Sequence, residues 1–308
     1  MVRVAILEHF APEVQPQLRG LAGADLELVF PGSDRVEDRA ASLAAAEYAV
    51  VRAVKMPAEL LDAAPALRMI HQWGTGVDGI PLAAARDRGI LVARSPGRNA
   101  PSVADLTLGL MLACLRRICI GDARVRAGDW AEPDLYDIGR DLTGAKVGLV
   151  GYGAIAQAVA ARLKGFDCTL LYSSRSGGLP LDEMLGRVDV VSLHVPATAE
   201  TRHLINAARI AAMRRGTVLI NTARGELVDE VALAQSLHSG QIGAAGLDAF
   251  ATEPLPAGSP LRQAPNTVFS AHSGGRTREN FARMVRHWAG NIRAHATGQP
   301  LDPQNLVG

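Results

Sequence analysis

Four stretches of the sequence end a short apolar run with a side chain that can do chemistry. SLHVP carries His194, NTARGE carries Arg224, LDAFATEP carries Glu253 and SAHSGG carries His272. Because ligands of open α/β sheets bind at the carboxyl ends of the strands, we expect these groups at one edge. An arginine can bind a carboxylate and polarise a ketone, an imidazole can deliver a proton, and a carboxylate can orient that imidazole. This combination suits hydride transfer to a 2-oxo acid.

A glycine-rich turn between a strand-like and a helix-like run predicts a dinucleotide site. The pattern is GxGxxA, with Gly151 allowing a tight turn and Gly153 letting backbone approach a pyrophosphate. Ala156 replaces the third glycine, at the position where the helix packs on the strand. The helix that follows offers free N–H groups and a positive dipole end to phosphate. The alternative interpretation is a plain strand–turn–helix connection.

The end of the next strand bears on the choice of cofactor. An Asp or Glu usually stands there and binds the ribose hydroxyls of NAD. This chain instead has Ser173, Ser174 and Arg175. Two hydroxyls and a guanidinium favour a dianionic 2′-phosphate, so we expect NADP to be preferred, with NAD possible. The alternative is that Arg175 is a solvated loop residue.

Short β-type runs alternate with alanine-rich helical stretches, which predicts parallel sheets with crossover helices. We expect an α/β fold of two lobes, each a mostly parallel sheet flanked by helices, with a Rossmann-type cofactor lobe. A loop rich in Pro, Gly and Asn over 94–102 marks the boundary, and the last helix is expected over 278–296. The expected strands are 2–7, 49–52, 69–73, 90–93, 147–150, 169–172, 190–195, 218–221, 245–250 and 267–271.

An apolar helix is expected over 103–118, with Ser102 and Asp105 as a capping pair at its start. Packing of this helix in a hydrophobic core would account for one apolar stripe along it. The apolar residues cover more than one stripe, so a subunit interface is an open alternative. We expect a homodimer through the region 103–126.

Composition narrows the partners and the compartment. The chain has 32 basic and 31 acidic residues and a formal net charge of +1, which gives no electrostatic reason to expect nucleic acid or a membrane as partner. Its three cysteines show no CxxC spacing, so no disulfide framework or zinc site is expected and a cytoplasmic location fits. The longest apolar helical run has about ten residues, short of the ~20 that a membrane span needs.

Seven stretches together resemble the D-isomer-specific 2-hydroxyacid dehydrogenases over nearly the whole chain. They are WGTGVDGI, GRNAPSVADLTLGLML, LVGYGAIAQAVAARL, SLHVPATAETRHLI, INTARGELVDEVAL, GLDAFATEP and AHSGG. The resemblance implies that Arg224, Glu253 and His272 are the catalytic residues. It implies a substrate domain over 1–98 and 276–308, a dinucleotide-binding domain over 99–275 and dimerisation through 103–126.

The resemblance also implies roles for smaller groups. Thr75 and Gly76 would present backbone amides to the substrate carboxylate, and Asp248 would meet the nicotinamide carboxamide. The expected substrate contacts are Lys55, Thr75, Gly76, Arg224 and His272, and no metal is expected. The expected cofactor contacts are Gly151, Gly153, Ala154, Ile155, Ser173, Ser174, Arg175, His194, Val195, Pro196, Thr201, Thr222, Ala223, Asp248, His272 and Gly274.

The chain departs from the family pattern at three places. Asp105 stands where glutamate is usual, and Ala271 stands where proline usually precedes the histidine. Thirteen residues separate Arg175 from Asp189, where family members usually fit a further short helix or strand. We therefore expect the side of the cofactor groove that would bind the adenine to be shortened and open.

We interpret the chain as an NAD(P)H-dependent reductase of a small 2-oxo acid such as glyoxylate or hydroxypyruvate. A D-3-phosphoglycerate dehydrogenase is the first alternative, with Arg52 and Lys55 as candidates for a substrate phosphate. A formate dehydrogenase shares a resemblance at Asn99, but that branch pairs its histidine with a glutamine. A nucleotide-sensing, corepressor-like scaffold is the alternative outside enzymes, and turnover of 2-oxo acids would distinguish it.

Overall fold

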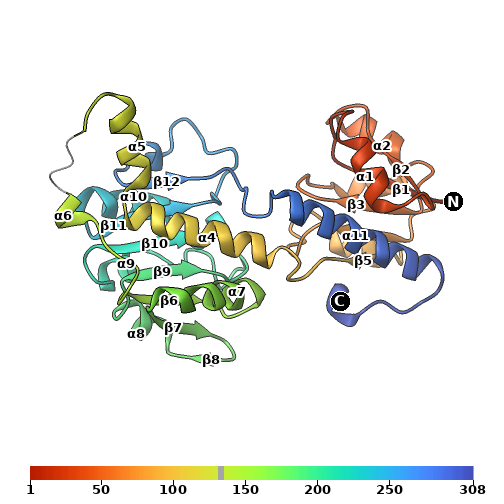
Figure 1. The fold of residues 1–308 in the computed structure, drawn as a ribbon. Coiled ribbons are helices and arrows are strands. Elements are labelled where there is room, and N and C mark those ends of the chain that lie inside the picture. The colour runs from red at the N-terminus through yellow and green to blue at the C-terminus, as the bar shows by residue number, and fades with distance from the viewer. Residues whose placement is uncertain (131–134, 308) are drawn as a thin grey trace. The chain divides into compact units, whose positions relative to one another are not determined.

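The computed structural model describes residues 1–130 and 135–307. The chain divides into two compact units (Figure 1). Unit 1 comprises Met1–Asn99 and Thr277–Gly308, and unit 2 comprises Ala100–Arg276. The domain ranges expected from the sequence include residues 131–134 and 308, which lie outside the described residues.

Unit 1 is built on a five-stranded parallel sheet with the order β2-β1-β3-β4-β5. Helices α1 and α11 pack on one face, and α2, α3 and the short 3₁₀ helix η1 cover the other. Burial on both faces explains why strands such as YAVV are apolar at every position. Its elements are β1 (Val2–Ile6), α1 (Gln15–Ala22), β2 (Leu26–Val29), α2 (Val36–Leu43), β3 (Tyr48–Val51), η1 (Ala58–Ala63), β4 (Met69–Gln72), α3 (Leu82–Asp87), β5 (Leu91–Ala93), α11 (Arg278–Ala296) and η5 (Pro303–Asn305).

Helix α11 is held in unit 1 by an apolar stripe and begins at a clear cap. The Thr277 side chain accepts a hydrogen bond from the N–H of Asn280 at 3.1 Å. Its buried residues recur one turn apart, including Met284, Trp288 and Ile292, as an amphipathic helix requires. The helix therefore joins the sheet formed by the first third of the chain.

Unit 2 is built on a seven-stranded sheet with the order β12-β11-β10-β9-β6-β7-β8. Helices α4 and α7 pack on one face, and α8, α9 and α10 pack on the other. Its strands are β6 (Lys146–Val150), β7 (Thr169–Ser174), β8 (Gly177–Gly178), β9 (Val190–Leu193), β10 (Thr217–Asn221), β11 (Ile242–Leu247) and β12 (Thr267–Phe269). Its helices are α4 (Ala100–Leu115), α5 (Ile118–Arg126), α6 (Leu135–Ile138), α7 (Ala154–Leu163), η2 (Lys164–Phe166), α8 (Leu181–Leu185), α9 (Ala207–Ala212), η3 (Gly225–Leu227), α10 (Glu230–Ser239) and η4 (Pro260–Gln263).

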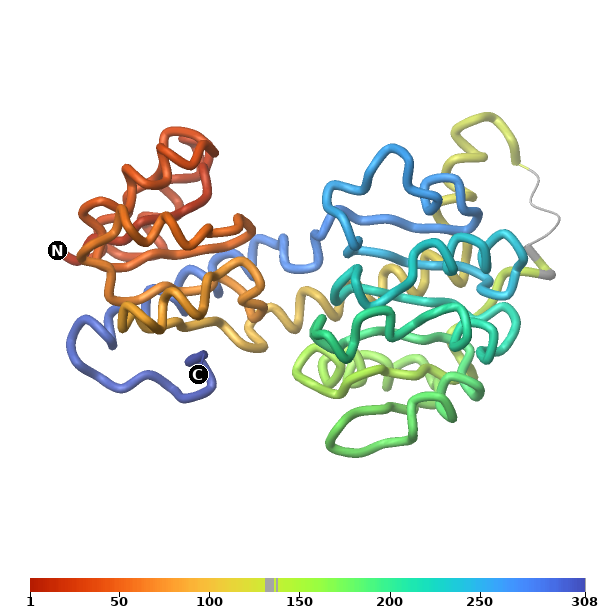
Figure 2. The backbone as a smooth tube through the Cα atoms, turned by 180° about the vertical axis from the view of Figure 1, so that it is seen from behind, coloured from red at the N-terminus to blue at the C-terminus, as the bar shows by residue number. Residues whose placement is uncertain are grey.

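The sheet of unit 2 is doubly wound, as a Rossmann-type lobe requires. From β6 the chain adds β7 and β8 on one side and then β9 to β12 on the other. The order reverses between β6 and β9, which is where such sheets bind dinucleotides. All neighbouring strands are parallel except β7 and β8, which form an antiparallel hairpin at the sheet's outer edge (Figure 2).

The segment between Arg175 and Asp189 corrects one expectation. It does contain a short strand and a helix, namely β8 and α8. However, β8 has two residues and runs antiparallel, where a doubly wound sheet usually has a full third parallel strand. This edge is therefore reduced to a hairpin rather than left without secondary structure.

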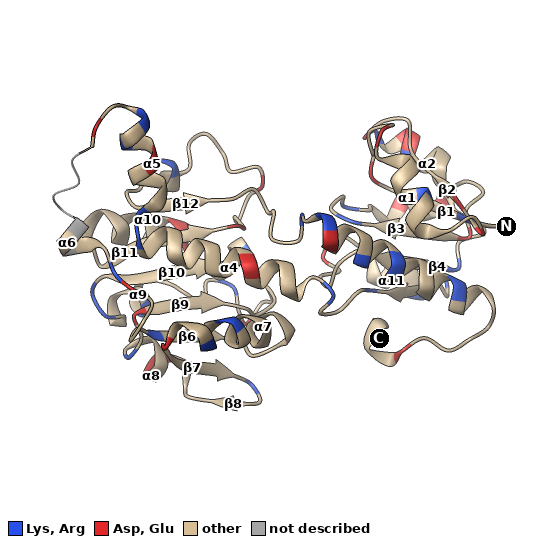
Figure 3. Ribbon diagram, in the orientation of Figure 1, with Lys and Arg blue, Asp and Glu red and all other residues tan. Residues whose placement is uncertain are grey.

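Helix α4 also differs from the expectation at both of its ends. It begins at Ala100, so Ser102 is a buried residue within the helix and does not cap it. It ends at Leu115, because Arg117 takes a left-handed conformation (φ 54°) before α5 begins. Figure 3 shows that α4 carries almost no charge. Packing on α7 and on strands β10 to β12 accounts for much of its apolar surface.

All ten expected strands are present, although several end elsewhere. Strand β11 is Ile242–Leu247 rather than 245–250, so Asp248 lies just beyond the strand and not within it. Strand β7 extends through Ser174, so both serines belong to the strand. The strands β2 and β8 were not expected. Across residues 1–130 and 135–307, no helix has the length and apolar character to span a membrane.

Candidate active site

His272 and Glu253 form a direct pair at the carboxyl edge of the unit 2 sheet. Glu253 follows β11, and His272 follows β12, the next strand in the sheet. The Nδ1 of His272 lies 2.8 Å from Oε2 and 3.1 Å from Oε1 of Glu253. Both side chains remain accessible, with exposed fractions of 48% and 37%. With Nδ1 directed to the carboxylate, Nε2 is the nitrogen that can exchange a proton with a substrate.

Arg224 lies at the end of the neighbouring strand β10, in a turn fixed by Asn221. The Asn221 side chain donates to the Arg224 carbonyl at 2.8 Å and accepts from the N–H of Ala223 at 3.1 Å. A side chain at Gly225 would collide with the backbone of Phe250. The glycine therefore lets the Arg224 turn lie against the turn that carries Glu253, whose Oε1 accepts from the Phe250 N–H at 3.0 Å.

Asp248 holds the loop that presents His272. Its carboxylate is 2% exposed and accepts hydrogen bonds from the Ser270 hydroxyl at 2.5 Å, the Ser273 N–H at 2.8 Å and the Gly274 N–H at 2.9 Å. Its carbonyl accepts from the N–H of His272, a residue in the left-handed region at φ 48°. Sequence reasoning missed this contribution of the serines, for which the only signal was their position on either side of the histidine.

The turn between β6 and α7 has the features of a phosphate-binding turn. Gly151 adopts φ 89°, and a Cβ there would lie 2.6 Å from the His194 carbonyl oxygen. A Cβ on Gly153 would meet nothing within 4 Å, so the backbone is open to a ligand. No side chain caps α7, whose first residues are Ala154 and Ile155, so its N-terminal N–H groups are available to an anion. These residues fit the diphosphate of a dinucleotide.

Strand β7 leads into the hairpin that carries Arg175. The Ser174 hydroxyl donates to the Gly177 carbonyl at 3.0 Å, so it is engaged within the hairpin. Tyr172 stacks on Tyr152 of the glycine turn, with ring centroids 4.2 Å apart. The hydroxyl of Thr198 and, more weakly, the charge of Arg175 lower the pKa of Glu200. Arg175 is therefore within electrostatic reach of Glu200 in the loop that follows β9.

That loop contains four of the expected cofactor contacts. Burial lowers the pKa of His194 to about 4, so its imidazole is neutral near pH 7. The Thr201 hydroxyl donates to the Pro196 carbonyl at 2.8 Å, and Val195 lies against the glycine turn, since its side chain would be 2.8 Å from a Cβ on Gly151.

The remaining predicted residues are placed as follows. Thr222 is buried, and its hydroxyl lies 2.9 Å from that of Thr107 in α4, so it is directed toward the helix. Lys55, Thr75 and Gly76 follow strands β3 and β4 of unit 1, whereas Arg224, Glu253 and His272 belong to unit 2. The Thr75 hydroxyl donates to the Ser95 carbonyl at 3.3 Å. In the part of the chain that the structure describes, no three His, Cys, Asp or Glu side chains gather as metal ligands would.

A doubly wound sheet, an open phosphate-binding turn and an imidazole–carboxylate pair at one sheet edge define an NAD(P)-dependent oxidoreductase. Residues 108–274 match the model for the D-isomer specific 2-hydroxyacid dehydrogenase NAD-binding domain. The chain is 40% identical over 259 residues to the glyoxylate reductase of Thermofilum pendens, covering 80% of this chain and 76% of that protein. It belongs to the D-isomer specific 2-hydroxyacid dehydrogenase family.

Two further similarities bear on substrate and cofactor. The D-3-phosphoglycerate dehydrogenase of Mycobacterium leprae is 38% identical over 87% of this chain, which spans 52% of that enzyme. The solved NADPH-dependent glyoxylate/hydroxypyruvate reductase of Sinorhizobium meliloti superposes with a TM-score of 0.83 and is 30% identical, with 100% of this chain and 98% of that chain covered.

Proposed function

We propose that this enzyme is an NADPH-preferring reductase of small 2-oxo acids of the glyoxylate and hydroxypyruvate type. The observation that carries the proposal is the His272–Glu253 pair, which lies on the same sheet edge as an open dinucleotide turn. The choice of substrate is supported by the similarity to glyoxylate reductases, since the pair by itself does not distinguish one 2-oxo acid from another.

The residues of unit 2 are assigned complementary roles in the reaction. His272 delivers the proton to the ketone oxygen from Nε2, while Glu253 holds Nδ1 and orients the ring. Arg224 binds the substrate carboxylate and polarises the ketone. The bound nicotinamide supplies the hydride. In the oxidative direction His272 accepts the proton of the hydroxyl group.

The cofactor preference is assigned to Arg175. Ser174 uses its hydroxyl within the hairpin, so we propose that the guanidinium is the principal ligand of the 2′-phosphate, with Ser173 nearby on the strand. The short β7–β8 edge leaves this side of the sheet without a third parallel strand. The NADPH dependence stated for the Sinorhizobium meliloti enzyme is in keeping with this assignment.

The other expected contacts complete the proposed site. Thr75 and Gly76 are proposed to bind the substrate carboxylate through backbone amides, with Lys55 nearby, so unit 1 would be the substrate domain. Asp248 Oδ2 accepts one of the hydrogen bonds described above, and we propose that it also accepts one from the nicotinamide carboxamide. The backbone at Gly151, Gly153, Ala154 and Ile155 is proposed to bind the diphosphate.

We also propose a homodimer formed through α5. None of its residues is buried, and Ile118, Ile120 and Val125 are exposed. Ile118 and Val125 are seven residues apart and so lie on one face of α5, and exposed apolar side chains that share a face commonly mark a protein interface. The cysteines Cys114, Cys119 and Cys168 are free thiols, which suits a reducing cytoplasm.

A single screen tests the proposed function. Oxidation of NADPH and NADH would be followed with glyoxylate, hydroxypyruvate, pyruvate and 3-phosphohydroxypyruvate. We expect the highest kcat/KM with glyoxylate or hydroxypyruvate and NADPH. A clear preference for 3-phosphohydroxypyruvate would instead indicate a phosphoglycerate dehydrogenase, and the absence of turnover with all four would indicate a binding protein.

A further inference from the structure

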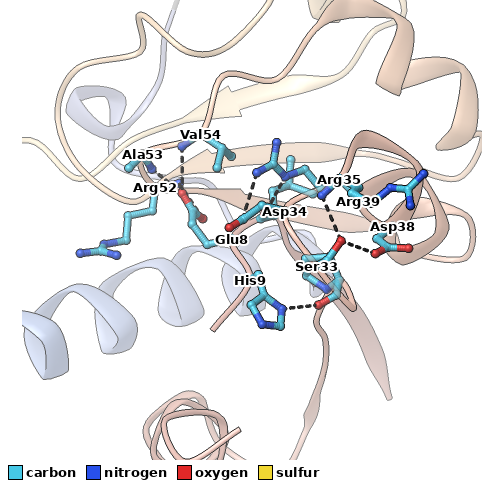
Figure 4. Close-up of polar contacts among 12 residues, drawn as sticks. Glu8, His9, Ser33, Asp34, Arg35, Asp38, Arg39, Arg52, Ala53 and Val54 are labelled. Atoms are coloured by element: carbon cyan, nitrogen blue, oxygen red, sulfur yellow. Dashed lines mark hydrogen bonds and ion pairs between the residues drawn. The ribbon is translucent and has the colours of Figure 1, made fainter. Parts of the chain in front are cut away.

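A buried carboxylate organises the loop that follows strand β3 of unit 1. Glu8 lies two residues beyond the end of β1 and is 7% exposed. Three consecutive backbone N–H groups, those of Arg52, Ala53 and Val54, donate to it (Figure 4). Oε1 lies 2.9 Å from the Arg52 nitrogen and 3.1 Å from the Val54 nitrogen, and Oε2 lies 3.1 Å from the Arg52 nitrogen.

This arrangement is an anion-binding nest whose anion is supplied by the protein. Successive N–H groups that converge on one point form a concave site for negative charge. Burial raises the pKa of Glu8, while the three N–H donors and the charge of Arg52 act in the opposite direction. The Arg52 side chain is directed away from Glu8 (Figure 4). The Glu8 carboxylate therefore binds the backbone of the turn and not the Arg52 side chain, which points in another direction.

The held turn, residues 52–55, presents two cations at the carboxyl edge of the sheet. The Arg52 guanidinium carbon lies 5.9 Å from the ring centroids of both Phe10 and Trp73. Gln72 donates from its side chain to the Arg52 carbonyl at 3.0 Å. Lys55 is exposed at the end of the turn. Both basic groups thus depend on a backbone path that Glu8 fixes.

The turn also lies directly against the loop that follows β4. The N–H of Met56 donates to the Gly79 carbonyl at 2.8 Å. A Cβ on Gly79 would lie 2.9 Å from the Val54 carbonyl oxygen, so the two backbones are in close contact. The second loop contains Thr75 and Gly76, the proposed ligands of the substrate carboxylate.

We propose that Glu8 is a positioning residue that sets the 52–55 turn to contact the substituent beyond the ketone carbon of the substrate. This inference rests on the proposed function. Glyoxylate carries only hydrogen at that position, whereas hydroxypyruvate carries a hydroxymethyl group. Glu8 therefore governs the enzyme's selectivity for substituted 2-oxo acids over glyoxylate, through the turn rather than by touching the substrate.

The test compares Glu8→Gln and Glu8→Ala with Glu13→Gln, an exposed carboxylate five residues further on as the matched control. Glu8→Gln keeps one acceptor oxygen but loses the negative charge, and its NH₂ group replaces the second oxygen and faces the Arg52 N–H donor. We expect the KM for hydroxypyruvate to rise about tenfold in both Glu8 variants. Their KM for glyoxylate and their kcat should stay within about twofold of wild type, as should all constants of the control.

Chemical rescue distinguishes a filled nest from a general loss of structure. Glu8→Ala leaves the three N–H groups facing a space of carboxylate size, so added formate or acetate should lower its KM for hydroxypyruvate. The same salts should not improve the wild type, the control or Glu8→Gln. Glu8→Asp offers a second variant that keeps the charge, and it should retain more selectivity than Glu8→Gln.

Two results would overturn the inference. One is an equal change in KM for the two substrates, which would mean that Glu8 only stabilises unit 1. The other is unchanged selectivity in folded Glu8→Gln. A wild type that reduces neither substrate would instead refute the proposed function, and with it this inference, so the two failures are distinguishable.

Discussion

At the scale of residues, two carboxylates divide the work around His272. Glu253 contacts the imidazole, whereas Asp248 contacts the loop backbone and the neighbouring serines. The Glu253 contact orients the imidazole ring, and the Asp248 contacts fix the position of the loop that carries it. A loop that includes a left-handed histidine would be strained in isolation, so the Asp248 hydrogen bonds stabilise a conformation the chain would otherwise leave.

Replacing His272 by alanine is expected to lower kcat for 2-oxo acid reduction by roughly 10²- to 10⁴-fold, the usual contribution of a general acid. Glu253→Gln should give an intermediate loss, because the ring keeps a hydrogen-bond partner but loses the neighbouring carboxylate charge. The measurement is kcat and KM of reduction for wild type and both variants. Near-normal turnover in His272→Ala would assign the proton to another group.

The residue types at the strand ends could be predicted from the sequence, because parallel sheets place all their carboxyl ends at one edge. Arg224, Glu253 and His272 follow from that rule together with the family resemblance. The hydrogen bonds of Asp248 could not be predicted, because they depend on a left-handed turn at His272, and the spacing of hydrophobic residues does not indicate such a turn. Glu8 was missed because its partners are backbone groups about 45 residues away along the chain.

At the scale of elements, hydrophobic runs predicted the strands that are buried on both faces. Strand β2 was missed because Glu27 interrupts a run of only four residues. Strand β8 was missed because it consists of two glycines, which have low β propensity, and exists only through its pairing with β7. The start of α4 was misplaced because Ser102 resembles a cap in sequence, while the helix begins at Ala100, three residues before the expected start at residue 103.

The β7–β8 hairpin gives a prediction about cofactor choice. Arg175→Ala should raise the KM for NADPH by about ten- to a hundredfold, the value of a charge-assisted hydrogen bond of roughly 1.5–3 kcal/mol. The KM for NADH should change little, because that cofactor has no phosphate for the guanidinium to bind. Arg187→Ala, in an exposed pair with Glu183, provides the control. An unchanged KM for NADPH would remove Arg175 from the cofactor site.

Helix α5 gives a prediction about assembly. A double substitution of Ile118 and Val125 by aspartate places two charges on one exposed face of α5 and should prevent dimer formation. Light scattering at micromolar concentration should give about twice the chain mass of 32.5 kDa for wild type and about that mass for the variant. Val36→Asp, an exposed apolar residue in unit 1, should leave the mass unchanged. A monomeric wild type would contradict the proposal.

At the scale of the whole molecule, the first and last parts of the chain are joined by a buried polar network in unit 1. His71 of β4 is fully buried, donates from Nδ1 to the Gln72 carbonyl at 2.8 Å and accepts from Asn291 of α11 at 2.8 Å. Asn305 of η5 donates to Asn291 at 3.3 Å. The apolar stripe of α11 could be read from the sequence, but this chain of side chains could not, because its members lie 220 residues apart.

The network makes stability depend on pH in a definite direction. Burial lowers the pKa of His71 to about 3, from an ordinary value of 6.5. The unfolded chain therefore takes up this proton below about pH 6.5 while the folded protein does not. The contribution of neutral His71 is complete above that pH and is lost as pH falls toward 3. At pH 4.5, about two pH units below the unfolded pKa, the loss amounts to roughly 3 kcal/mol.

His71→Gln isolates this contribution, because glutamine cannot take up a proton. The variant should be less stable than wild type at pH 7.5, since the buried amide does not reproduce both hydrogen bonds. The gap in free energy of unfolding should then shrink steadily between pH 6.5 and 4.5, because only wild type loses the histidine contribution. Urea titrations followed by the fluorescence of Trp73 and Trp288, both buried in unit 1, would measure it. His9→Gln, at an exposed histidine, should show no such convergence, and a gap for His71→Gln that stays constant over this range would mean that His71 is not held neutral.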